Sequence, residues 1–387
     1  MAIKNKSILY ILLILLCVAM VLEACTHKEE ALVSDDNFTL QLKWNKAYAT
    51  ETKQMAETGF LWTLCFLGAE LPKDSFIEGV VWNNNNLQVN FSKLGFSNQN
   101  LQALAKLIVQ FKQSEEYRKM EAIDLGRFVA LTLNSANHYY AITGVAKTFE
   151  GFKKGKIFDS KQFVATNSTI STYDRIIDLP DSNNIDYVKD AYISNECDGK
   201  VSDGNYTITS FEVFEQMRNG QFRFAIYDST GLLLSAAKGS AGKPAKCLWC
   251  HETTIQTIFV EQKDEPGFYS SEQFKNIVTR NILALKKYRN TLQSDLDFEK
   301  KNDHTYTELL YISFMEPNAE RLALEWGMSI ERVKEKLVGL PTHTHSEFDY
   351  LGELYFRDAI DKLAPFASIK APSSAREKSP YEPDLIK

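Results

Sequence analysis

The sequence lacks an excess of basic residues, an internal repeat and a hydrophobic run long enough for a membrane span. Its 44 Lys and Arg residues are outnumbered by 50 Asp and Glu residues. The resulting net charge of −6 argues against a nucleic-acid partner, because phosphate binding needs basic patches. No self-similarity with a period of 20–50 residues, the signature of repeat architectures, is visible. The uncharged apolar run from Ile8 to Leu22 is shorter than the roughly 20 residues that a helix needs to cross a bilayer.

That apolar run has the flanks of a secretory signal peptide. Lys4 and Lys6 precede it, and it ends in the sequence LEAC at positions 22–25. This ending resembles the lipobox of bacterial lipoproteins, and the resemblance implies that Cys25 is lipidated and becomes the mature N-terminus. An ordinary signal peptide or an uncleaved anchor is the alternative. We therefore expect residues 1–24 to be a lipoprotein signal peptide and residues 25–40 to form a tether.

The residues that follow Cys25 favour the outer membrane. Position 26 is threonine, not the aspartate that tends to retain lipoproteins at the inner membrane of enteric bacteria. The sequence KEE at 28–30 resembles the export tag of some Gram-negative lipoproteins, and it also suits a simple solvated tether. With either interpretation the lipid attaches the chain to the membrane, and the folded part faces the periplasm or the cell surface.

Cysteine is sparse, yet two of the six cysteines stand beside a histidine in AKCLWCHE at 245–252. The order Cys247, Cys250, His251 is the attachment pattern of c-type haem. Two thioether bonds would join the haem vinyl groups to cysteines one helical turn apart, and the adjacent histidine would bind the iron from the proximal side. The motif resembles that of c-type cytochromes over these five residues, and it implies one covalent haem c. Bacteria attach such haem outside the cytoplasmic membrane, where the signal peptide would send the chain.

Two other interpretations of this motif remain open. A structural zinc site needs two further Cys or His ligands. The candidates His304, His343 and His345 lie 53 to 94 residues beyond the motif, without the spacing of a zinc finger. A disulfide between Cys247 and Cys250 suits an oxidising compartment, but it gives no reason for the adjacent histidine.

Three residues are candidates for the distal side of the iron. Met315 lies 64 residues after the motif histidine, just before a predicted helix, and resembles in this the methionine ligand of small class I cytochromes. His343 and His345 lie in a predicted loop that could reach the ring. Each also suits an ordinary structural role, Met315 in the core and the histidines on the surface.

Three other polar or sulfur-containing residues have simpler interpretations. Cys65 falls in an apolar helical run and is expected to be a buried small hydrophobe. Cys197 falls in a polar loop, and a disulfide between the two is compatible with export. His138, in an apolar and aromatic segment, is expected to be a core or turn residue.

The remaining pattern predicts an α+β fold, with a helical N-terminal part, a strand-rich middle segment and a helical C-terminal half around the haem site. Apolar residues at helical spacing, a hairpin across Asn83–Asn86 and a capping box at Ser270 and Gln273 are its clearest local features. The helix pair at 318–338 resembles a helix-turn-helix, but we interpret it as two packed helices around Gly327. The expected division is 41–155 as a mainly helical domain, 156–245 as the strand-rich segment, 246–367 as the haem motif with helices, and 368–387 as a disordered tail.

Electron transfer to an unidentified redox partner protein is the role that these features predict. One alternative is a haem enzyme or a small-ligand sensor with an open iron position. Another is a haem-free binding or structural lipoprotein in which Cys247 and Cys250 form a disulfide.

Overall fold

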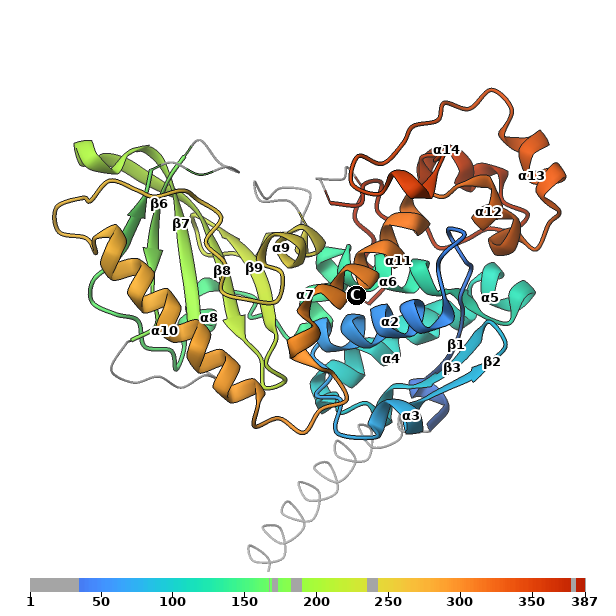
Figure 1. Ribbon diagram of the computed structural model, residues 1–387, viewed down its shortest axis with the longest axis horizontal. Coiled ribbons are helices and arrows are strands. Elements are labelled where there is room, and N and C mark those ends of the chain that lie inside the picture. Colours follow the sequence, from blue (N-terminus) through green and yellow to red (C-terminus); the bar gives the residue numbers. More distant parts are fainter. Residues whose placement is uncertain are drawn as a thin grey trace, which may run out of the picture.

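The computed structural model describes residues 35–166, 168, 173–181, 190–234, 243–376 and 381–386. The expected signal peptide, Cys25 and most of the expected tether lie outside these residues. The described part has helices in both halves of the chain and strands mainly in the middle, which confirms the predicted α+β class (Figure 1). None of its helices combines the length and the apolar composition needed to cross a membrane.

The N-terminal part packs helices against a small sheet. Strands β2 and β3 pair as the hairpin predicted across Asn83–Asn86, and β1 joins them on one side and pairs with β4 on the other. The sequence predicts a mainly helical domain here with one hairpin, so strands β1 and β4 were not predicted. Its elements are η1 (Asp35–Phe38), β1 (Thr39–Lys43), α2 (Lys53–Phe66), α3 (Ser75–Gly79), β2 (Val80–Asn83), β3 (Asn86–Asn90), η2 (Phe91–Lys93), α4 (Asn98–Gln113), α5 (Glu115–Met120), β4 (Ile123–Asp124), α6 (Leu125–Leu133), α7 (Ala136–Thr143) and α8 (Phe149–Lys153).

The middle segment forms an antiparallel sheet in which the strands follow chain order. One face of the sheet lies under α9 (Pro244–His251) and α10 (Ser271–Arg289), and the connection 252–270 joins these two helices (Figure 1). On the other face, Phe149 of α8 stacks on Phe211, with ring centroids 4.0 Å apart. The strands are β5 (Phe163–Ala165), β6 (Asp174–Asp178), β7 (Ala191–Lys200), η3 (Val201–Asp203) after it, β8 (Asn205–Gln216) and β9 (Phe222–Asp228).

The C-terminal half returns to the N-terminal helices. Helix α11 (Thr305–Met315) packs on both α2 and α6. The close approach of α11 to α2 and α6 depends on Gly59 in α2 and Gly126 in α6. A Cβ at either position would come within 2.6 Å of the α11 backbone. The capping box at Ser270 and Gln273 begins α10 as predicted. Other elements are η4 (Phe298–His304), α12 (Ala319–Trp326), α13 (Ile330–Leu337), η5 (Asp349–Leu351), α14 (Arg357–Ile360) and η6 (Asp361–Leu363).

Two sequence-based expectations about helices have different outcomes. The pair α12 and α13 packs around Gly327, as predicted, and encloses a small apolar core of its own around Trp326 and Val333. The stretch 346–363 belongs to the half of the chain that is predicted to be helical, but it forms only the short helices η5, α14 and η6. Gly352 ends η5 with φ +80° and ψ −147°, a conformation through which a helix cannot continue.

The described residues of the C-terminal stretch pack against the helices, although the sequence predicts disorder there. Ala371 is buried, the Pro383 carbonyl accepts a hydrogen bond from Ser135, and the Leu385 amide donates to His138 Nε2 at 2.9 Å. The predicted core role of His138 is therefore confirmed. The disulfide considered between Cys65 and Cys197 is absent, since both thiols are free.

Candidate functional site

The motif CLWCH forms the end of a short helix, α9. Pro244 begins the helix, where its lack of an amide hydrogen leaves no donor unpaired. Glu252 ends the helix in the left-handed conformation, with φ +46°. Residues four apart lie on one helical face, so Cys247 and His251 point the same way. Both line a pocket between α9 and the sheet, whereas Leu248 faces the other side. Cys247, Cys250 and His251 are each partly exposed.

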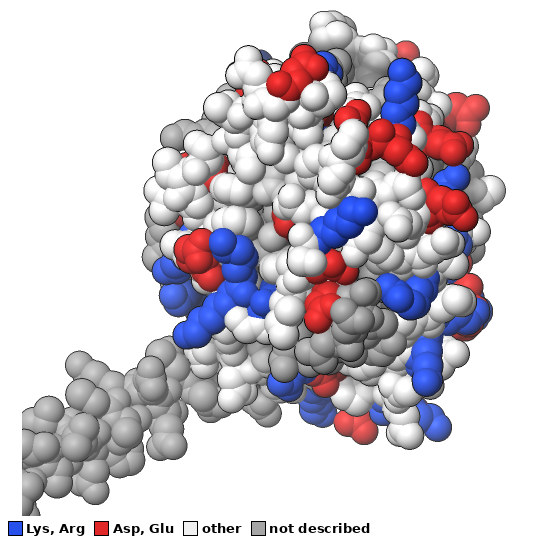
Figure 2. Space-filling model, turned by 90° about the vertical axis from the view of Figure 1, so that its left-hand side faces the viewer, with Lys and Arg blue, Asp and Glu red and all other residues white. Residues whose placement is uncertain are grey.

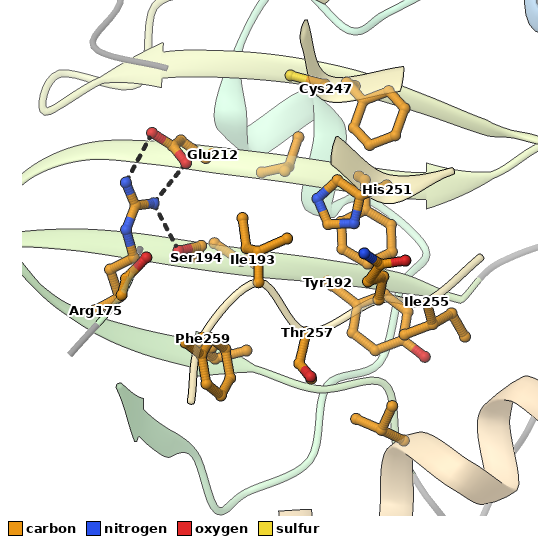
Figure 3. A pocket seen from close by; sticks show the side chains of 18 of the residues that line it. Arg175, Tyr192, Ile193, Ser194, Glu212, Cys247, His251, Ile255, Thr257 and Phe259 are labelled. Carbon is orange, nitrogen blue, oxygen red and sulfur yellow. Dashed lines mark hydrogen bonds and ion pairs between the residues drawn. The ribbon is translucent and has the colours of Figure 1, made fainter. Parts of the chain in front are cut away.

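The pocket is large, mostly apolar and formed on the sheet face (Figure 3). Its empty volume, which includes space open to solvent, is about 860 Å³. Strands β6 to β9 form its floor, and the connection 252–270 with α10 closes the side opposite α9. Its apolar lining consists of Ile177, Tyr192, Ile193, Val213, Phe214, Phe224, Ala225, Ile226, Ile255, Ile258, Phe259, Phe274 and Val278.

His251 is held in this pocket by two aromatic rings. Its imidazole centroid lies 5.0 Å from that of Phe214 on β8 and 5.4 Å from that of Phe224 on β9. Its Nδ1 is buried and has no hydrogen-bond partner among the described residues. Burial lowers the pKa of His251 to about 4. The ring is therefore neutral at physiological pH, which is the form that binds metal ions.

The two motif cysteines are thiols. Neither forms a disulfide. Burial raises the pKa of the Cys247 thiol, with a further contribution from the carboxylate of Glu212. An uncharged thiol facing apolar walls is a poor site for a thiolate-metal bond, which needs the deprotonated form. Among the described residues, no group of three or more His, Cys, Asp or Glu side chains is arranged to hold a metal ion.

A buried ion pair forms the end of the pocket away from His251 (Figure 3). Arg175 on β6 binds both carboxylate oxygens of Glu212 on β8, and its Nη1 donates to Ser194 Oγ at 3.0 Å. Glu196 also accepts from Arg175, at 3.4 Å. Burial raises the pKa of Glu212, and Arg175 partly offsets that shift. The pocket thus has one polar end, where the guanidinium of Arg175 is already paired with two carboxylates.

The structure does not bring the three distal candidates into this pocket. Met315 is buried at the end of α11 and belongs to the main core. His343 Nε2 lies 2.9 Å from the carboxylate of Glu316, and the ring stacks on Phe356. His345 stacks on Phe348. These contacts agree with the ordinary structural roles that the sequence also suggested for the three residues.

The C-terminal stretch holds α9 at its start and on its outer side. The Lys243 side chain is completely buried, and its Nζ lies 3.2 Å from Glu382 and 3.1 Å from the Ser374 carbonyl. Arg376 lies over the ring of Trp249, 4.2 Å from the centroid. These contacts fix the helix that carries the motif to a segment more than 120 residues further along the chain.

The residues present can accommodate a haem group at this site. Cys247 lines the pocket and Cys250 follows one turn later, as thioether attachment requires. His251 faces the same space with a neutral ring, and the apolar walls suit a macrocycle. Sequence reasoning identified these three residues but not Arg175 on β6, Glu212 and Phe214 on β8, or Phe224 on β9. Comparison of the chain with protein-family models, curated proteins and solved structures finds no match.

Proposed function

We propose that this protein is a membrane-anchored lipoprotein that carries one haem c on α9. Cys247 and Cys250 would form the thioether bonds, and His251 would be the proximal iron ligand. The observation that carries the proposal is that Cys247 and His251, from one helical face, line the same large apolar pocket. Haem bound there supplies an iron that alternates between the ferric and ferrous states. The protein's own residues exclude water from one side of the ring and hold the imidazole neutral.

Electron transfer is the role that we propose for this haem. The partial exposure of Cys247, Cys250 and His251 supports it, because a haem attached at the surface can pass electrons to a partner without entry of a substrate. The face shown in Figure 2 mixes acidic and basic side chains with broad uncharged areas. A surface of this kind suits a protein partner better than nucleic acid, which selects continuous basic surfaces.

A second candidate is a small-ligand sensor or haem enzyme with an open iron position. It is favoured by one observation: among the described residues that line the pocket, His251 is the sole imidazole and none is methionine. An iron with one strong protein ligand can bind a small molecule such as nitric oxide or peroxide on its distal side.

Carbon monoxide distinguishes the two roles. The protein is matured with haem, reduced with dithionite and scanned before and after addition of carbon monoxide. For an electron carrier with six-coordinate iron we expect reversible one-electron reduction and no change in the Soret band. A shifted Soret band would show an open position and would replace electron transfer by the second candidate.

The membrane anchor is tested at Cys25. Changing Cys25 to Ala should move the protein from the membrane fraction to the soluble fraction, since the residue that carries the lipid is lost and a single 15-residue apolar run cannot span the bilayer. Fractionation followed by N-terminal mapping measures this. Retention of the variant in the membrane, with a native N-terminus other than Cys25, would contradict the lipoprotein proposal. Changing Cys17, which lies within the apolar run, to Ala provides the matched control and should leave the protein membrane-bound.

A further inference from the structure

A cluster of titratable side chains lies behind α9, on the side opposite the pocket. Ala245 and Leu248 of α9 line a small cavity together with His304, Glu308 and Tyr311. Figure 1 shows α9 between the sheet and α11, the helix that carries the last two of these polar residues. The proposed haem and this cluster would therefore lie on opposite faces of one helix.

The cavity contains polar groups that are buried and unpaired. Both ring nitrogens of His304 and the hydroxyl of Tyr311 are buried without a well-aligned hydrogen bond among the described residues, although Arg376 lies near the hydroxyl and the backbone of Asn302 lies near the imidazole. His304 and Tyr311 are only 6 % and 2 % exposed. The space for the centre of a water molecule is about 10 Å³, the room that one water needs. His304 Nε2 lies 3.8 Å from Glu308 Oε1, too far for a direct hydrogen bond.

Glu308 shares its cationic partner, Arg376, with another carboxylate. Arg376 Nη2 lies 3.1 Å from Glu308, and its Nη1 lies 2.6 Å from Glu347. Glu252, at the end of α9, also contributes negative charge at Glu308. Arg376 contacts two of these three carboxylates, so the cluster keeps excess negative charge, while His304 and Tyr311 are ordinarily neutral. A proton on Glu308 relieves that excess and provides a donor toward the unpaired nitrogen of His304, directly or through a water molecule.

We propose that Glu308 is a proton-binding residue whose protonation is coupled to the redox state of a haem on α9. The inference rests on the proposed haem function. When a one-electron donor reduces ferric iron to ferrous iron, the site loses one positive charge, and Glu308 takes up one proton from solvent to form its carboxylic acid. By linkage, a proton on Glu308 favours the ferrous state to the same extent. Burial already raises the pKa of Glu308 to about 7, with Arg376 opposing the shift, so the coupling operates near neutral pH.

The test is a redox titration of the haem-loaded protein between pH 5.5 and 8.5, with dithionite and ferricyanide. We expect the midpoint potential of the wild-type protein to fall as pH rises through about 7. Glu308→Gln mimics the protonated carboxyl and should keep the midpoint near its low-pH value throughout. Glu347→Gln should move the transition to lower pH, because Arg376 then pairs with Glu308 alone. Glu320→Gln, on an exposed part of α12, is the matched control and should behave as wild type.

A second measurement does not depend on the haem. A carboxyl group with a raised pKa in the folded state stabilises the fold when protonated. Its contribution is therefore full below the unfolded pKa of ~4.3 and is lost as pH rises through the folded value. We expect the unfolding midpoint in urea to fall between pH 4.5 and 7.5 more steeply in wild type than in Glu308→Gln.

The outcomes separate the two proposals. A protein that carries haem but has a midpoint independent of pH, or a Glu308→Gln variant that keeps the pH dependence, overturns this inference alone. A protein without haem overturns the proposed function and this inference with it, and the urea titration still shows whether Glu308 binds a proton near neutral pH.

Discussion

Replacement of Cys247 and Cys250 together by alanine is expected to abolish covalent haem. In the proposed attachment each thiol would supply one of the two thioether bonds, and both positions lie on the helix that faces the apolar pocket. Alanine is the best helix former, so α9 should persist in the variant. The measurement is a denaturing gel stained for haem peroxidase activity, run on protein made with a cytochrome c maturation system. The stain should disappear while the amount of protein remains comparable.

The two other cysteines of the folded part provide a matched control. Cys65 and Cys197 are buried in α2 and β7, outside the motif, and both are free thiols. The Cys65→Ala and Cys197→Ala variants should keep the haem stain, although loss of a buried group can lower their stability. His251→Ala should remove the proximal ligand and can also impair attachment. A stain that survives in the Cys247→Ala, Cys250→Ala double variant would contradict attachment through this motif.

Changing Arg321 to alanine is expected to lower the free energy of unfolding by about 3–5 kcal/mol, the range for breaking a buried ion pair. Arg321 lies 2.7 Å from Asp124 and 2.6 Å from Glu325, and all three side chains are almost fully buried. Loss of the guanidinium leaves the buried Asp124 without its ion-pair partner, whereas Glu325 keeps Arg127 and Arg357. Denaturant unfolding measures the change. A loss below about 1 kcal/mol, the usual limit for a surface pair, would contradict the role of this contact.

The same contact belongs to a buried network that joins the C-terminal helices to α6. Arg127 binds Glu116 and Glu325, and Arg357 also binds Glu325. The exposed pair of Lys334 and Glu320 is the control, because Lys334→Ala should change stability by less than about 1 kcal/mol. Outside the proposed haem site, we expect substitutions in this buried network to lower the stability of the protein most.

Local features of the fold could be predicted from the sequence because neighbouring residues determine them. The asparagine run at 83–86 tolerates the turn of the first hairpin, and Asn84 adopts φ +54° there. Ser270 and Gln273 form the capping box that begins α10. The motif is also local, because Cys247, Cys250 and His251 all lie on one helix, α9.

Features that depend on long-range contacts could not be predicted. The Arg175–Glu212 pair joins β6 to β8 across an intervening strand, and nothing near either residue indicates the register. The polar C-terminal composition suggested disorder, yet Lys243 is buried against Glu382 from that stretch. Met315 has the sequence spacing of a distal ligand. It is nevertheless buried at the end of α11, because that helix packs against α2 and α6.

The central claim is that the mature chain carries one haem c on Cys247 and Cys250. The most direct test is a reduced pyridine haemochrome spectrum combined with intact mass, on protein made with a cytochrome c maturation system. We predict a haem c band with one haem per chain and a mass equal to that of the lipidated chain plus one haem. A protein without that band, with the mass of the lipidated chain alone, would contradict the account and leave Cys247 and Cys250 to a disulfide or another metal.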